Sequence, residues 1–313
     1  MFSIIIPTYN RLDSVINLVN SLSKQIKAGD EIIVIDDGST DNTFGMLMQL
    51  PFEWLRVYQI SNSGGPARPR NIGYHKAKNN WVCFLDSDDW WASEKLYQLR
   101  NHLAGQEKFV AFSYHNAFGS KSKRIFGNHL YQNSDVYTFT RNPIVMSSLT
   151  VNKLFFDHDR DLFDERDAAS SIEDTIFAYE LCFNNMPYIY IDKCLSVYTE
   201  ASSDSISQSH HQFTKMYLYH NKNPYDLHWI NSSLIKAYWK AKSTFPLKNI
   251  KNPIRKMSFS LNSLFGIFYI PLMVTILLYT RIWVDIIKLP SSKNNFIIDS
   301  DLQEYNKPVK SIK

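Results

Sequence analysis

The first hundred residues alternate between short apolar runs and segments in which apolar residues recur at helical spacing. The runs are rich in β-branched residues and lie at 2–6, 32–35, 55–60 and 81–85. Helical spacing occupies 11–26, 41–50 and 70–78, and it begins again at residue 93. Short apolar runs of this kind are typical of strands buried on both faces of a parallel sheet. The alternation predicts an α/β fold, a mainly parallel, doubly wound (Rossmann-like) sheet flanked by helices.

Polar motifs follow three of these predicted strands. They are Pro7-Thr8-Tyr9-Asn10-Arg11, Asp36-Asp37-Gly38-Ser39-Thr40-Asp41 and Asp86-Ser87-Asp88-Asp89. Ligands of open parallel sheets bind beyond the carboxyl ends of the strands. We therefore expect the three motifs to meet at one edge of the sheet and to form the functional site.

The pair Asp86 and Asp88 is the sharpest of these signals. Two carboxylates at a strand end suit a hard cation such as Mg²⁺ or Mn²⁺, which the two phosphates of a nucleotide would also hold. Such a metal neutralises a leaving diphosphate. The alternative is an acidic turn in which Asp89 or Ser93 caps the next helix. The second acidic motif, at Asp36, favours the metal site.

The motif at Asp36-Asp37-Gly38 predicts a nucleotide contact. A carboxylate there can accept the imide N–H of uracil or a ribose hydroxyl, and Gly38 permits a tight turn near the ligand. The alternative is a turn followed by a helix cap. Asp41 alone suffices as the cap, so that alternative leaves the two preceding acids unexplained.

These motifs, together with Asn62-Ser63-Gly64-Gly65-Pro66 and Arg70-Asn71-Ile72-Gly73, strongly resemble glycosyltransferase family 2 in order and spacing over about residues 1–100. The resemblance implies a GT-A fold, a nucleotide-diphosphate sugar donor with UDP favoured, a divalent cation (Mn²⁺ or Mg²⁺) and inversion at the anomeric carbon. It also implies a setting in bacterial O-antigen, capsule or related polysaccharide assembly.

The same resemblance assigns site residues. Pro7, Thr8 and Tyr9 would line the nucleobase pocket, Asp37 would bind the base, Arg70 would lie near the base and diphosphate, Asp86 near the ribose or sugar, and Asp88 on the metal. The donor-binding set is completed by Arg11, Gly64 and Ser87.

Inversion by a single displacement needs a general base that takes the proton from the acceptor hydroxyl. Family members carry a Glu-Asp pair at the start of a later helix, and Glu173-Asp174 fits that place, with Asp174 as the candidate base. One alternative is a capping box between Ser171 and Asp174. Other acidic candidates nearby are Asp164, Glu165 and Asp167.

One segment departs from the family pattern. Many members continue with Tyr-Arg-x-His, which helps to hold the metal and diphosphate, whereas this chain has Tyr198-Thr199-Glu200-Ala201. His210 or His211 could replace the missing histidine as a metal ligand. The departure puts the third metal contact in doubt but leaves the donor motifs untouched.

The last third of the chain is basic and apolar. Residues 227–284 contain no acidic residue and carry a charge of +8, so the remainder of this +4 chain carries about −4. Residues 257–280 contain no charged side chain and would span roughly 36 Å as a helix, although Pro271 would kink it. We expect a monotopic or re-entrant membrane segment, with basic side chains on anionic headgroups. These are Lys248, Lys251, Arg255, Lys256 and Arg281. A transmembrane span and a buried or oligomer-forming helix are the alternatives. The region lacks a base-reading motif, which argues against nucleic acid.

The expected organisation is a catalytic domain at 1–205, with a donor- and metal-binding half at 1–104 and an acceptor and base half at 105–205, followed by a helical membrane-association region at 206–313. In the second half we expect strands at 109–114 and 145–151 and a helix at 171–183. The three cysteines are expected to be small buried residues of a reducing cytosol. No signal peptide is visible.

The expected function is transfer of a hexosyl or N-acetylhexosaminyl group to a lipid-linked or other saccharide acceptor. The enzyme would lie in the cytoplasm, peripheral or monotopic on the inner face of the cell membrane. Two alternatives remain. One is a nucleotidyltransferase, which would want a Gly-rich, Lys-bearing loop after the first strand. The other is a catalytically degenerate protein that binds nucleotide sugars.

Overall fold

The computed structural model describes residues 1–122, 125–127, 144–166, 172–184 and 186–199. These residues belong to one compact unit that spans Met1–Ser207. The predicted membrane segment, its five basic residues, His210 and His211 lie outside the described residues, and so does the predicted domain boundary at 205. Within the described part, no helix is both long enough and apolar enough to cross a membrane.

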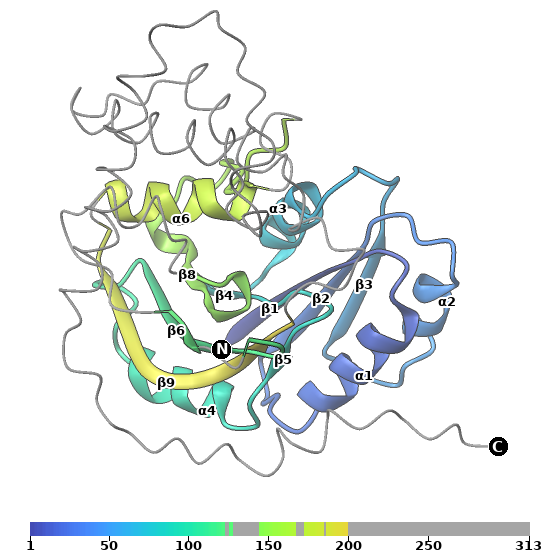
Figure 1. Ribbon diagram of the computed structural model, residues 1–313, viewed down its shortest axis with the longest axis horizontal. Helices are drawn as coiled ribbons and strands as arrows, with labels where there is room; N and C mark the ends of the chain where they lie inside the picture. The colour runs from blue at the N-terminus through green and yellow to red at the C-terminus, as the bar shows by residue number, and fades with distance from the viewer. Residues whose placement is uncertain (123–124, 128–143, 167–171, 185, 200–313) are drawn as a thin grey trace, which may run out of the picture. The chain divides into compact units, whose positions relative to one another are not determined.

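The amino-terminal half contains the alternating strands and helices that the sequence predicts (Figure 1). In chain order they are β1 (Phe2–Thr8), α1 (Leu12–Leu22), β2 (Glu31–Asp36), α2 (Thr43–Leu47), β3 (Leu55–Gln59), α3 (Ala67–Lys76), β4 (Trp81–Phe84), β5 (Trp90–Trp91) and α4 (Lys95–Leu103). The predicted elements of this half are confirmed, with ends that shift by up to four residues.

The second half departs further from expectation. Its elements are β6 (Phe112–Gly119), β7 (Ile125–Phe126), the 3-10 turn η1 (Met146–Ser148), β8 (Thr150–Asn152), the 3-10 turn η2 (Lys153–Phe155), α6 (Glu173–Phe183) and β9 (Tyr188–Tyr198). The strand predicted at 145–151 is wrong for its first part, where the chain forms η1, and only its end enters β8. The strand predicted at 109–114 begins three residues later, at Phe112, and continues to Gly119.

The described strands form one mixed sheet in the order β3-β2-β1-β4-β8-β6-β9-β5, with β7 beside β6. The first four strands are parallel, and so are β6 and β9. Strand β8 runs antiparallel to both β4 and β6, and β5 runs antiparallel to β9. The sheet is therefore parallel from β3 to β4 and becomes mixed where β8 pairs with β4.

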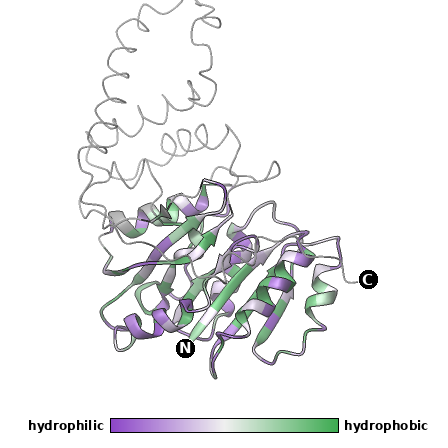
Figure 2. Cartoon of the chain, turned by 60° about the horizontal axis from the view of Figure 1, so that its bottom comes forward, coloured by the Kyte–Doolittle hydropathy of each residue, from purple (hydrophilic) through white to green (hydrophobic). Residues whose placement is uncertain are grey.

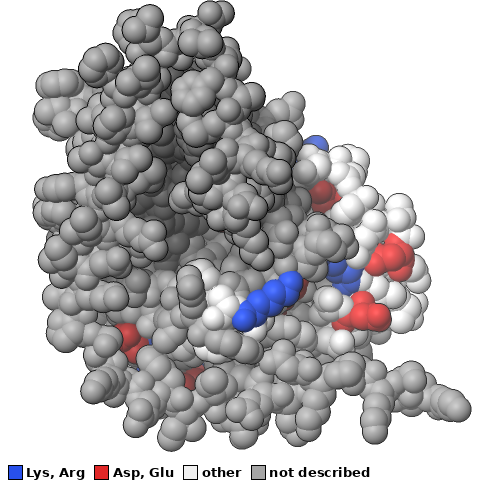
Figure 3. Space-filling model, viewed as in Figure 1, with Lys and Arg blue, Asp and Glu red and all other residues white. Residues whose placement is uncertain are grey.

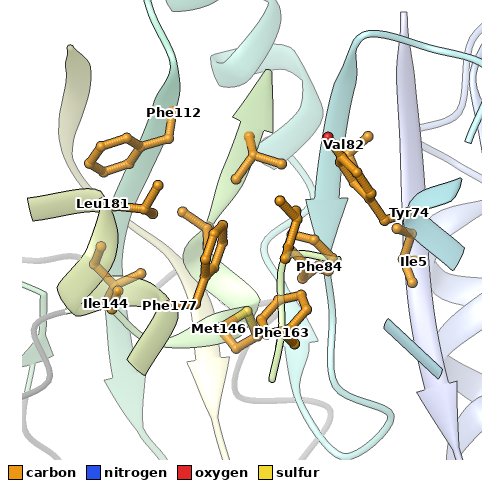
Figure 4. Packing of buried hydrophobic residues seen from close by; sticks show 14 of the residues in the cluster. Ile5, Tyr74, Val82, Phe84, Phe112, Ile144, Met146, Phe163, Phe177 and Leu181 are labelled. Atoms are coloured by element: carbon orange, nitrogen blue, oxygen red, sulfur yellow. The ribbon is translucent and has the colours of Figure 1, made fainter. Parts of the chain in front are cut away.

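Helices cover both faces of the sheet. On one face of the sheet, an apolar cluster contains strand residues such as Ile5 and Phe84 together with residues of α3 and α6. Phe177 and Leu181 are among its members from α6 (Figure 4). On the other face, residues such as Ile4 pack against α1, α2 and α4. Apolar residues occupy the strands and inward helix faces, while polar residues dominate the loops (Figure 2). The buried strands are continuous apolar runs in the sequence because helices cover both faces of the sheet.

The contact between α3 and β1 depends on a glycine. A Cβ atom built on Gly73 would lie 2.4 Å from Cγ2 of Ile5, so any side chain there would push α3 away from the sheet. This close approach sets the depth at which α3 packs and hence the position of Arg70, three residues earlier.

The cysteines fit the prediction in part. Cys83 is buried, whereas Cys194 is only partly buried, and neither forms a disulfide. The side chain of Cys182 lies outside the described part. Burial raises the pKa of the Cys83 thiol to about 11, which keeps it protonated and unreactive.

We expect Gly73→Ala to lower the free energy of unfolding by about 1–3 kcal/mol, because the added methyl group overpacks the contact with Ile5. Chemical denaturation of the single variants and of the double variant with Ile5→Ala measures the coupling. The Gly73 substitution should cost much less in the Ile5→Ala background. Strict additivity of the two free energies would show that the two residues are not in steric contact.

Candidate active site

The loops after β1, β2 and β3 are joined by hydrogen bonds at the carboxyl edge of the sheet. The Asn10 amide donates to Oγ of Ser39 over 2.8 Å, and the Thr40 amide donates to Oδ1 of Asn10 over 2.7 Å. Asn10 adopts a positive φ of 49° to make this link. The loops after β1 and β2 therefore form one continuous surface.

The acids of the second motif have different roles. Asp36 is fully buried and accepts the Ser39 amide at 3.1 Å and the side-chain amide of Gln59 at 2.8 Å, so it holds the turn. Asp41 accepts the amides of Leu12 and Thr43 at the starts of α1 and α2. Asp41 thus binds amides at the starts of both helices, although the N-cap residue of α2 is Asn42 and not, as the sequence predicted, Asp41.

Asp37 points to the loop after β3. It accepts the amide of Ser63 at 2.8 Å and its hydroxyl at 2.9 Å, and burial raises the pKa of its carboxyl. A Cβ on Gly38 would lie 2.8 Å from the Asn62 amide nitrogen, so the close approach of these two loops requires glycine. Gly64, in the loop after β3, has a φ of 79°, and a Cβ atom built on it would meet no atom within 4 Å.

The motif at the end of β1 lies beside Asp37. Tyr9 is exposed, whereas Thr8 is buried at the end of β1, where its carbonyl accepts the Asp37 amide over 2.8 Å. Pro7 is buried in the same strand. The Thr8 hydroxyl has no hydrogen-bond partner among the described residues. The sequence-predicted base-binding residues thus adjoin one another, and one of them offers an unused polar group.

Asp86-Ser87-Asp88-Asp89 forms a tight turn directly after β4. The Asp89 amide donates to the Asp86 carbonyl over 3.0 Å, which closes the turn. Ser87 is buried, whereas the side chains of Asp86 and Asp88 keep 29% and 37% of their surface exposed. These two carboxylates are therefore available to a ligand at the edge of the sheet.

Asp88 pairs with Arg11, the last residue of the β1 motif, over 2.5 Å. Both side chains are more than one-third exposed, and an exposed ion pair of this kind contributes little stability. A cation or a phosphate could therefore replace either partner at small cost.

Figure 3 shows charges of both signs intermixed on the described surface seen from one side.

Asp89 does not cap α4. Its carboxylate accepts the Ser147 hydroxyl at 2.6 Å and the Thr199 amide at 2.7 Å, and α4 begins at Lys95 without a side-chain cap. The capping interpretation, through Asp89 or Ser93, is therefore wrong. Thr199, which stands where the family pattern has arginine, also donates its hydroxyl to the Asp88 carbonyl.

Arg70 joins the acidic turn to α6. Its Nη2 donates to Asp86 over 2.6 Å, and its Nη1 donates to Glu173 over 2.9 Å. The guanidinium is buried and lies 5.4 Å from the ring centre of Phe163. Burial opposes its charge, but the two carboxylates outweigh burial and raise its pKa. Contact of Arg70 with a diphosphate stays a prediction, whereas its bridge between the two acidic motifs is a feature that the sequence did not reveal.

Glu173 and Asp174 occupy the first turn of α6, where negative charge is favoured by the helix dipole. Burial raises the pKa of Glu173 to about 7 against the opposing effect of Arg70. Burial also raises the pKa of Asp174, whose Oδ1 accepts the Thr175 amide at 2.6 Å. Arg70 thus links Glu173 to Asp86, and both carboxyl groups of the pair hold protons more tightly than free carboxyls.

Two of the competing acids serve other contacts. Asp164 accepts the Arg166 side chain at 2.8 Å, and Glu165 accepts the Asn71 side-chain amide at 2.9 Å. Asn71 also exchanges hydrogen bonds with the backbone of Phe163, which ties this loop to α3. Asp167 and Ser171 lie outside the described residues.

Among the described residues, no group of three or more His, Cys, Asp or Glu side chains could by itself hold a metal ion. Asp86 and Asp88 nevertheless supply exposed carboxylate oxygens from one turn. That donor set fits a hard cation that takes its remaining ligands from phosphates and water.

A comparison with protein families decides the assignment. The sequence model of glycosyl transferase family 2 matches residues 3–156, which include β1 to β8 and all three motifs. The matched residues, about half of the chain, belong to glycosyltransferase family 2. The resemblance seen in the sequence is therefore confirmed.

Curated relatives share the amino-terminal motifs of this family 2 chain. The poly(ribitol-phosphate) beta-N-acetylglucosaminyltransferase TarS of Staphylococcus aureus is 42% identical over 99 residues, which cover 30% of this chain and 17% of TarS. The UDP-Glc:alpha-D-GlcNAc-diphosphoundecaprenol beta-1,3-glucosyltransferase WfaP of Escherichia coli is 35% identical over 127 residues, 41% of this chain and 50% of WfaP. The chain thus matches half or less of the length of these two relatives.

Solved structures confirm the GT-A fold. S. aureus TarS 1–349 in complex with UDP aligns with a TM-score of 0.58 and 25% identity, over 88% of this chain and 78% of that one. The mannosyltransferase PcManGT of Pyrobaculum calidifontis, in complex with GDP-Man and Mn²⁺, aligns with a TM-score of 0.53 over 90% of this chain and 74% of that one. Its 15% identity supports the fold alone.

Stability should depend on pH through Glu173. Its pKa is about 7 in the folded chain against 4.5 ordinarily, so the folded state holds the proton more tightly. Stability from this residue is complete below about pH 4.5 and is lost as pH rises towards 7. The free energy of unfolding of Glu173→Gln, measured by urea denaturation across this range, should lack that loss. Identical pH dependence in the variant and the unmodified chain would contradict the assignment.

Proposed function

We propose that this chain transfers a sugar from a nucleotide-diphosphate sugar, with UDP favoured, to an acceptor hydroxyl with inversion at the anomeric carbon. The observation that carries the proposal is the Arg70 bridge, which brings the donor-side carboxylate Asp86 and the Glu173-Asp174 pair to one place. Similarity to TarS, whose structure was solved with UDP, supports the choice of nucleotide.

The donor nucleotide would occupy the surface formed by the loops after β1, β2 and β3. Asp37 and the Thr8 hydroxyl, which has no hydrogen-bond partner among the described residues, supply polar groups for the base and ribose, and exposed Tyr9 supplies an aromatic face. Gly64 leaves the loop tip open to a ligand. Arg11 and Asp88 would exchange their mutual ion pair for contacts with the diphosphate and its cation.

A divalent cation, Mn²⁺ or Mg²⁺, would be held by Asp88 with Asp86 nearby. Bound there, it would neutralise the negative charge that develops on the leaving diphosphate. The Mn²⁺ in the PcManGT structure agrees with this choice of ion for the fold, but its low identity carries no residue assignment.

Asp174 is the proposed general base. The acceptor oxygen forms the new bond to the anomeric carbon, the bond to the diphosphate oxygen breaks, and the hydroxyl proton passes to the Asp174 carboxylate. The raised pKa of Asp174 makes its carboxylate a stronger base than a free aspartate. Glu173, which shares Arg70 with Asp86, would orient α6 rather than take the proton.

The acceptor is proposed to be a lipid-linked or other saccharide of bacterial polysaccharide assembly. The names of TarS and WfaP, which act on poly(ribitol-phosphate) and on a diphosphoundecaprenol-linked sugar, support this class. A position on the inner face of the cytoplasmic membrane would suit such a substrate. The basic residues that would contact the membrane are those predicted from the sequence of the last third of the chain.

One observation favours a second function, a nucleotide-sugar-binding protein without transferase activity. Thr199 stands where the family pattern Tyr-Arg-x-His has arginine, and its amide and hydroxyl are bonded to the acidic turn. The chain would then bind donors without turning them over.

We expect Asp174→Asn to lower kcat by about 10²–10⁴-fold, because the variant cannot take the acceptor proton. UDP release measured with UDP-sugars, Mn²⁺ and saccharide acceptors gives kcat, and calorimetry gives the Kd of UDP, which should change less than about twofold. Activity of the unmodified chain should fall as pH drops through the raised pKa of the base.

The exposed Asp13, in the first turn of α1, provides the matched control, and Asp13→Asn should keep full activity. Chelation of Mn²⁺ by EDTA should weaken UDP binding to the chain and to both variants alike. If Asp174→Asn retains the transfer rate, the base is another residue. UDP binding without transfer by the unmodified chain, across the donor and acceptor panel, would support the second function.

A further inference from the structure

The acidic turn is held from its buried side by one serine. Ser147 lies in η1 and is fully buried. Its hydroxyl accepts the Asp86 amide at 3.1 Å and donates to the Asp89 carboxylate over 2.6 Å. A single Oγ atom thus contacts both ends of the turn that presents the exposed carboxylates of Asp86 and Asp88.

The serine is in turn fixed by a buried lysine. Lys95, the first residue of α4, donates from Nζ to the Ser147 carbonyl over 2.7 Å and lies 3.5 Å from the ring centre of Trp91. The Trp91 indole N–H donates to the same carbonyl over 2.9 Å. Lys95 is fully buried, and burial lowers its pKa to about 7 although Asp89 opposes that shift.

We propose that Ser147 is a positioning residue for the acidic turn and that Lys95 holds Ser147 in place. The inference rests on the proposed function for its consequence, since the turn presents Asp86 and Asp88 to the donor and cation. Ser147 contacts neither of these carboxylates and acts through the backbone of Asp86 and through Asp89.

The chemistry of the residues argues against simple core packing. Apolar residues of similar volume often replace buried charges without loss of stability, so core packing alone does not call for a lysine. Here the lysine donates to the carbonyl of the one residue that contacts both ends of the turn. A site that binds charged ligands must hold its carboxylates to within about 0.5 Å, which requires support of this kind.

The same 3-10 turn offers a matched control. Ser148 is also fully buried, but its hydroxyl donates to the Val145 carbonyl over 2.7 Å, within its own turn. Ser147→Ala and Ser148→Ala therefore remove the same atom from adjacent buried positions. Of the two, Ser147 alone has a side chain bonded to the acidic turn.

A second matched pair isolates the lysine. Lys153 donates to the carbonyls of Tyr74 and Ala77 and lies 5.0 Å from the ring centre of Tyr74, at the end of α3. Lys153→Met and Lys95→Met therefore both remove an ammonium group that serves backbone carbonyls beside an aromatic ring. The first lies away from the acidic turn, and the second lies directly behind it.

The test compares the four variants with the unmodified chain in three measurements. These are the Kd of UDP with Mn²⁺ by calorimetry, kcat and KM for the donor, and hydrogen exchange of the Asp86 amide. Ser147→Ala and Lys95→Met should weaken UDP binding by about tenfold, raise the donor KM and speed exchange of the Asp86 amide by at least about tenfold. Ser148→Ala and Lys153→Met should change each by less than about twofold. Ser148→Ala should lower Tm about as much as Ser147→Ala, whereas Lys153→Met, at a half-buried position, should lower Tm less than Lys95→Met.

Equal effects of the paired variants on UDP binding and on exchange would overturn the inference, because burial alone would then explain both residues. The exchange measurement needs no ligand. If the unmodified chain fails to bind UDP, the proposed function fails, and the exchange rates still decide whether Ser147 and Lys95 position the turn. If Lys95→Met does not fold, the comparison of Ser147→Ala with Ser148→Ala carries the decision.

Discussion

The site depends on one buried guanidinium. Arg70 extends from α3 between the acidic turn after β4 and the first turn of α6, and it donates to one carboxylate on each side. Two acids brought together in a buried place repel each other unless a cation lies between them. Arg70 supplies that cation. Removing one partner of a buried pair costs about 3–5 kcal/mol, so the two acidic elements are held as a unit.

The rest of the fold serves this arrangement. Gly73 lets α3 lie close against β1, which sets the depth of Arg70. Strand β8 inserts antiparallel beside β4, and the 3-10 turn before it places Ser147 behind the acidic turn. Strand β9 ends at Tyr198, next to Thr199, which closes the same turn from the other side. Residues from distant parts of the sequence thus fix two partly exposed carboxylates at the sheet edge.

The amino-terminal half of this architecture could be predicted because its signals are local. Buried parallel strands give continuous apolar runs, and the motifs follow those strands at the edge where ligands bind. The Glu173-Asp174 pair was also found, although by resemblance to the family rather than from its own spacing. The strand at 145–151 was predicted wrongly because η1 and the three-residue β8 follow each other within one short segment of mixed apolar and hydroxyl residues, which has no clear period. The Arg70 to Glu173 contact joins residues 103 positions apart and leaves no local trace. Lys95 had a weak signal, a cation at the start of a helix whose other buried residues are leucines and one glutamine.

The most direct test of the account is the substitution Arg70→Lys, which keeps the positive charge but removes the fork that reaches two carboxylates at once. The affinity for UDP with Mn²⁺, measured by calorimetry, and the transfer rate should be determined on the same folded preparation. The account predicts that both fall together, the affinity by about tenfold and the rate by about a hundredfold, because the acidic turn after β4 and the first turn of α6 lose their common support. A variant that keeps the affinity and the rate of the unmodified chain would contradict it.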